Sequence, residues 1–87
     1  MKIYIVNEFY RFTNNTFEIE QENKIVTTDY KEAVSKFNEL KESWSDCSYI
    51  EGNSKFEEEC NGEEKIAWQY DEEYGDGITI KLEVWEV

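Results

Sequence analysis

The chain has 87 residues, of which 21 are Asp or Glu, nine are Lys or Arg and none is His, so its formal net charge at pH 7 is −12. This length supports one domain (residues 1–87) with one modest core, and a composition that is 39% hydrophobic and 16% aromatic excludes a disordered chain. The lack of histidine excludes the usual catalytic triads, and the negative charge disfavours direct binding to nucleic acid or to an anionic membrane.

The first third of the chain predicts two strands joined by a turn. Residues 2–12 are rich in Ile, Val, Tyr and Phe, with apolar groups at both odd and even positions, which is typical of an interior strand. Residues 17–27 begin as a strand with one polar face, and a break in this alternation at Ile25 and Val26 indicates either a bulge near Asn23 or a short extra turn. The acidic residues expected to face outward on this strand are Glu18, Glu20 and Glu22.

Residues 29–44 predict an amphipathic helix. Asp29 is a suitable N-cap, and Glu32 stands three residues later, as in a capping box. Apolar residues then recur three or four positions apart and form one stripe, which we expect to pack on the core. The members of this stripe are Tyr30, Ala33, Val34, Phe37, Leu40 and Trp44.

The last part of the chain predicts a hairpin. Residues 46–64 show no clear periodicity, and we expect most of them to form loop. Residues 66–70 and 78–84 each alternate as strands, with Gly75 to Gly77 as the turn between them. The element order is therefore β-β-α-β-β. The expected fold class is α+β, an antiparallel sheet of about four strands with one amphipathic helix packed on one face.

We expect no catalytic residues, no metal site and no cofactor, and hence no enzyme. The N-terminal apolar run ends after four residues, too soon for a signal peptide, which favours a cytoplasmic location. In that compartment Cys47 and Cys60 are expected to be free thiols. Two thiolates without histidine do not complete a zinc shell, and adjacent carboxylates are usually just solvated. No nucleotide-binding motif occurs.

The acidic charge is unevenly distributed. Residues 1–45 carry six basic and eight acidic groups, a net of −2, whereas residues 46–87 carry three and thirteen, a net of −10. Charge that served only solubility would have no reason to concentrate in one half, so the asymmetry favours a basic partner. Exposed Trp and Tyr would then act as anchors. The predicted partner-binding residues are Glu18, Glu20, Glu22, Glu57, Glu58, Glu59, Asp71, Glu72, Glu73, Tyr74 and Trp85.

In its size, acidity and Lys/Asn/Glu/Ile-rich composition, the chain resembles the small inhibitor proteins that phages carry, among them DNA mimics and anti-CRISPR proteins. The resemblance is one of overall character. It implies an inhibitor that occupies the basic surface of a nucleic-acid-binding protein, such as a CRISPR effector, in the cytoplasm of the host cell. The alternative is a structural or adaptor module with no inhibitory role, which forms a homodimer or joins a larger assembly through its sheet.

Overall fold

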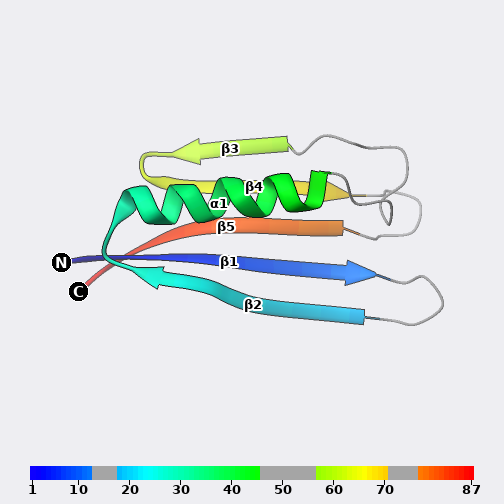
Figure 1. The fold of residues 1–87 in the computed structure, drawn as a ribbon, viewed down its shortest axis with the longest axis horizontal. Coiled ribbons are helices and arrows are strands. Elements are labelled where there is room, and N and C mark those ends of the chain that lie inside the picture. Colours follow the sequence, from blue (N-terminus) through cyan, green and yellow to red (C-terminus); the bar gives the residue numbers. More distant parts are fainter. Residues whose placement is uncertain (13–17, 46–56, 71–76) are drawn as a thin grey trace.

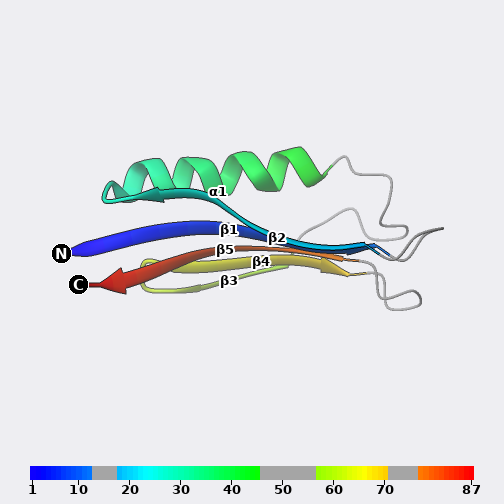
Figure 2. The same ribbon diagram turned by 90° about the horizontal axis from the view of Figure 1, so that it is seen from below.

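The computed structural model describes residues 1–12, 18–45, 57–70 and 77–87. These residues form a five-stranded sheet in the order β2-β1-β5-β4-β3, in which every neighbouring pair is antiparallel (Figure 1). The helix lies along one face of the sheet (Figure 2), so the expected α+β fold is confirmed. The elements are β1 (Lys2–Phe12), β2 (Glu18–Thr27), α1 (Tyr30–Ser45), β3 (Glu57–Asn61), β4 (Glu64–Tyr70) and β5 (Gly77–Glu86).

Strand β1 is an interior strand, as its two apolar faces predict. It pairs with β2 on one side and with β5 on the other. Pairing of the first strand with the last brings the two ends of the described chain together. The Met1 ammonium donates to the Val87 carbonyl and the Val87 N–H donates to the Met1 carbonyl, each at 2.8 Å.

The prediction of mostly loop for residues 46–64 is wrong at its end, because Glu57–Asn61 form strand β3. All five of its residues are exposed, so no apolar alternation marks it in the sequence. Instead it is held by the backbone ladder to β4, through a tight turn at Gly62 and Glu63. Gly62 has a φ of +63°, which suits the primed turns that join such hairpins. Residues 46–56, and the predicted turns at 13–16 and 75–76, lie outside the described residues.

The predicted bulge in β2 is confirmed. Val6 pairs with Ile25 but Asn7 pairs with Asn23, so Lys24 is the extra residue. On one side of the bulge, odd-numbered residues of β2 share a face with even-numbered residues of β1. On the other side, they share a face with odd-numbered residues of β1. Its extra residue has a role in the fold, because the Lys24 ammonium lies 3.7 Å from the Glu8 carboxylate.

The helix begins as its sequence predicts. The Asp29 carboxylate accepts a hydrogen bond from the Lys31 N–H at 3.0 Å, which makes it the N-cap. The Asp29 N–H donates to the Thr27 hydroxyl at 3.1 Å. In the predicted capping box, this N–H would instead have donated to the Glu32 carboxylate. The predicted stripe packs on β1, β2 and β5, and the buried apolar residues of the core are Tyr4, Val6, Ala33, Phe37, Leu40, Ala67, Ile78, Ile80 and Leu82.

A buried carboxylate ties the far end of the helix to the sheet. Glu8 is only 6% exposed and accepts a hydrogen bond of 2.7 Å from the indole N–H of Trp44. The Trp44 ring also packs on Tyr10, with 5.7 Å between ring centroids. Because a buried carboxylate without partners is costly, the indole and Lys24 together make Glu8 tolerable in this position.

We predict that Phe37→Ala destabilises the protein by about 3–5 kcal/mol, because it removes a fully buried aromatic ring from the centre of the core. Urea unfolding followed by circular dichroism measures the change. The neighbouring exposed Asn38→Ala is the matched control and should stay within about 0.5 kcal/mol of the wild type. A loss below about 1 kcal/mol for the Phe37 variant would contradict the helix placement.

We also predict that Trp44→Phe costs about 1–3 kcal/mol, since the variant keeps a ring but leaves the Glu8 carboxylate without its indole donor. Trp85→Phe is the matched control, because that indole is 57% exposed and its loss should change stability little. Equal effects of the two substitutions would show that the Glu8 contact does not stabilise the fold.

Candidate partner-binding surface

The face of the sheet turned away from α1 is here called the open face (Figure 2). Because side chains alternate along a strand, the odd-numbered residues of β1 and β5 lie on the open face, and the even-numbered ones face the helix. Val26 and Trp85 are 59% and 57% exposed there, which is unusual for large apolar side chains. The half-buried apolar residues of the same face are Ile3, Ile5, Phe9, Ile66 and Trp68. The open face thus exposes more large apolar side chains than a sheet face in contact with water alone needs.

Strand β3 adds carboxylates to the edge of the open face. Glu57 pairs with Trp68 and Glu59 pairs with Ile66, so both glutamates lie on this face. Glu58 points to the other side, where its carboxylate accepts a hydrogen bond of 2.8 Å from Lys41 of the helix. The three consecutive glutamates therefore divide into two that face outward and one that ties β3 to α1.

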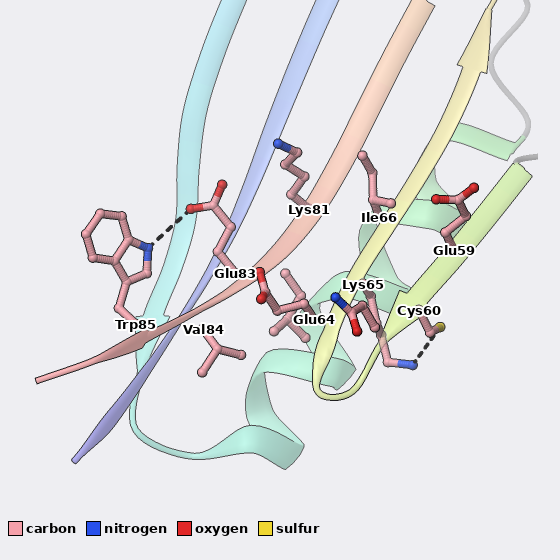
Figure 3. A pocket seen from close by; sticks show the side chains of 11 residues that line it. Glu59, Cys60, Glu64, Lys65, Ile66, Lys81, Glu83, Val84 and Trp85 are labelled. Carbon is pink, nitrogen blue, oxygen red and sulfur yellow. Dashed lines mark hydrogen bonds between the residues drawn. The ribbon is translucent and has the colours of Figure 1, made fainter.

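A shallow pocket of about 470 Å³ lies at one end of the open face (Figure 3). The indole N–H of Trp85 donates to the Glu83 carboxylate at 3.2 Å, which fixes the two side chains relative to each other. Glu64 enters from the neighbouring strand β4. The lining residues that bear on its chemistry are Glu59, Glu64, Ile66, Lys81, Glu83 and Trp85. Trp85 and Glu59 lie at opposite ends of this lining (Figure 3), so a cation bound there would contact some of these groups and not all of them.

The turn between β3 and β4 is fixed by a small hydrogen-bonded network. The Glu63 carboxylate accepts from the Lys2 ammonium at 2.7 Å and from the Tyr4 hydroxyl at 2.9 Å. These two hydrogen bonds hold the pKa of Glu63 below its usual range. The same carboxylate raises the pKa of Lys2 and of Tyr4, first through the hydrogen bond in each case. Anchoring Glu63 in this way also sets the position of Glu64, which follows it.

The structure does not bring all of the predicted partner-binding residues together. Glu22 is exposed on β2, at the opposite edge of the sheet from β3, and its carboxylate accepts a hydrogen bond from Lys24 at 2.9 Å. Glu18 and Glu20 pair in register with Phe12 and Tyr10, also at that far edge. Only Glu57, Glu59 and Trp85 share the open face on the β3 side. The predicted residues outside the described ranges are Asp71, Glu72, Glu73 and Tyr74.

Two carboxylates of the pocket, Glu64 and Glu83, were not among the predicted partner-binding residues. The signal for them was present in the sequence as strand alternation, because Glu64 precedes Ile66 by two positions and Glu83 precedes Trp85 by two. What the sequence could not supply was the pairing of β4 with β5, which makes them neighbours.

Other kinds of site have little support in the described ranges. No three Cys, Asp or Glu side chains there are grouped closely enough to hold a metal ion. Cys60 is a free, exposed thiol whose sulfur lies 3.6 Å from the Lys65 ammonium, whereas Cys47 falls outside the described ranges. The helix found there is neither long nor apolar enough to cross a membrane.

Comparison with known proteins finds no matching family model, no matching curated protein and no matching solved structure.

We predict that Glu63→Gln removes an acid-dependent part of the stability. A carboxyl whose pKa is lowered by folding stabilises the folded state above its unfolded pKa of about 4.3, and this contribution is lost as the pH falls through the lower folded value. Lys2 and Tyr4 have raised pKa values, so their contribution is complete below their unfolded values and is lost in strong alkali.

Urea midpoints measured from pH 2 to pH 7 test this prediction. The wild type should be more stable than the Gln variant near neutrality, and the difference should shrink below about pH 4. Exposed Glu59→Gln on β3, which has no contact with this network, serves as the control and should show little difference at any pH. A difference between wild type and the Glu63 variant that is constant across this range would contradict the network.

Proposed function

We propose that this chain is an acidic binding protein that inhibits a nucleic-acid-binding protein by occupying its basic surface. The observation that carries the proposal is the row of outward carboxylates on β3, Glu57 and Glu59, continued inward by Glu64 and Glu83. These belong to the half of the chain with the excess of negative charge, residues 46–87, at −10. The protein acts by binding and needs no catalytic group.

The sheet gives these carboxylates fixed spacings. Residues two apart on one strand lie about 6.6 Å apart, and neighbouring strands lie about 4.8 Å apart. A rigid array of this kind can take the place of phosphates against a cationic surface. Exposed ion pairs contribute only about 0–1 kcal/mol each, so affinity must come from several pairs together with apolar anchors. Trp85, which is 57% exposed, is the anchor that the open face provides.

The charge also determines how inhibition would work. A net charge of −12 repels nucleic acid, whose binding depends on cationic groups that release its counterions. The chain would therefore compete with nucleic acid for one surface of the partner and would not bind beside it. This is the mode of a DNA mimic or an anti-CRISPR-like inhibitor acting in the host cytoplasm, and a CRISPR effector is a partner of the right chemistry.

A second function is favoured by a different observation, the exposed apolar side chains of Val26 and Trp85 on the open face. They suit an adaptor that self-associates or joins an assembly through its sheet. The two functions respond oppositely to salt. Screening weakens the attraction between an acidic protein and a basic partner, but it relieves the repulsion between two copies that each carry −12.

The test is capture of a partner by the immobilised protein, followed by competition. We predict that high salt and added duplex DNA each release the captured partner. Glu57→Lys with Glu59→Lys should weaken capture by about tenfold or more, since each reversal replaces an attraction with a repulsion. Glu32→Lys with Glu39→Lys, on exposed positions of α1, makes the same change of charge elsewhere and should have a much smaller effect.

Capture that is insensitive to both salt and DNA would rule out the inhibitor function and leave the adaptor function in its place. Sedimentation of the free protein at low and high salt provides the complementary measurement. An adaptor that self-associates should become more dimeric as salt increases, whereas the proposed inhibitor should remain a monomer.

A further inference from the structure

The open face is divided into an apolar part and an acidic part. On the side of β1 and β2, Ile5 pairs with Val26, and Ile3 pairs with Trp85 of β5. On the side of β3 and β4, each outward glutamate is paired with an apolar residue. The outward glutamates of β3 therefore lie along one edge of the face, beyond Ile66 and Trp68 of β4. A partner that covers it needs apolar groups along one line and cations along a parallel line.

The acidic part contains an unfavourable pair that a cation would relieve. The register between β4 and β5 ends at Lys65 opposite Leu82, and the next residue of each strand, Glu64 and Glu83, lines the same pocket. Like charges close together on neighbouring strands are destabilising. No Lys or Arg in the described ranges forms an ion pair with either carboxylate, although Lys81 lines the same pocket.

The Trp85 ring completes a site suited to a guanidinium group. Its indole N–H donates to Glu83, and the largely exposed ring lies beside Glu83, on the side away from Glu64 (Figure 3). A guanidinium is planar, donates several hydrogen bonds in a fixed fork and stacks on aromatic rings, so it suits a site that offers both carboxylates and an exposed indole. A lysine ammonium would make the charge contact but not the planar one.

The length and shape of the open face suit a helix. Strands β1 and β5 have 11 and 10 residues and so extend roughly 33 Å, which a helix of about 22 residues would match. The other face already accepts α1 lying along the strands (Figure 2). An amphipathic helix also presents an apolar stripe with charged residues along its flank, which is the division that the open face shows.

We propose that the open face is a docking surface for a cationic amphipathic helix of the partner, with its apolar stripe over Ile3, Ile5 and Val26 and an arginine seated between Glu64 and Glu83 beside Trp85. This inference rests on the proposed function and specifies the part of the basic partner that is bound. A second copy of this chain is a poorer occupant, because it would bring its own −12 to an already acidic face.

The probe is a synthetic amphipathic helical peptide of about 22 residues, matched to the strand length, with a leucine stripe and arginines along one flank. Calorimetry should show binding that Glu64→Gln with Glu83→Gln weakens at least tenfold. The matched control, Glu32→Gln with Glu39→Gln, changes the net charge equally on exposed positions of α1 and should alter affinity by less than about threefold. Replacing the arginines of the peptide by lysines should also weaken binding.

Two further measurements separate docking from general attraction between opposite charges. A peptide of the same composition in scrambled order, without the apolar stripe, should bind at least tenfold more weakly. The Glu64→Gln, Glu83→Gln variant should make the free protein more resistant to urea, because it removes the repulsion between the two carboxylates. Trp85→Ala is a second binding variant and should also weaken peptide binding. Equal binding of the ordered and scrambled peptides, or of the double Gln variant and the wild type, would overturn the proposal.

The location of the bound peptide provides the last test. Amide chemical shifts should change on the odd-numbered residues of β1 and β5 and at Glu64. Changes confined to the outer edge of β3 would show that an extended segment adds to the sheet, and dimerisation of the protein would show that a second copy covers the face. Either result overturns helix docking, but the proposed function would still stand if DNA displaces the captured partner.

Discussion

A single helix of 16 residues has to cover a sheet of five strands, and it can cover only one face of it. The stripe of α1 buries Phe37 in one core cluster with Ile78, Ile80 and Leu82, which are among the least exposed side chains of the sheet. The described residues contain no second layer for the opposite face. The exposure of Val26 and Trp85, and the pocket beside Trp85, follow from this one constraint on a short chain.

The same constraint divides the acidic residues into two groups. Some stabilise the fold through a specific partner: Glu8 with Trp44, Glu58 with Lys41 and Glu63 with Lys2 and Tyr4. Each of these contacts joins segments that are far apart in sequence. The carboxylates on the open face make no ion pair within the described residues. The net charge alone does not distinguish these groups, but their hydrogen bonds do, and the second group is the one available to a partner.

Local patterns were sufficient to predict the elements that bury apolar residues. The helix, its Asp29 cap, the bulge near Asn23 and the two faces of the first and last strands all follow from spacing along the chain. Strand β3 could not be predicted in this way, because all its residues are exposed and the backbone ladder to β4 holds it.

The candidate site needed information that is not local. Whether Glu22 lies near Glu57 depends on the order of strands in the sheet, which places them at opposite edges. That Glu64 and Glu83 line the same pocket depends on the pairing of β4 with β5. Residues separated by nearly twenty positions are brought together by pairing, and no spacing rule along one strand predicts which strands will pair.

Protection of sheet edges offers a simpler explanation for some of the acidic residues. An exposed edge strand invites pairing with another chain, and charged side chains on it discourage this. That explanation fits Glu57 and Glu59, since β3 is an edge strand. It does not fit Glu64 and Glu83, because β4 and β5 are interior strands whose edges are already paired on both sides. These two carboxylates line one pocket without guarding an edge, and binding a cation of the partner is the role that we propose for them.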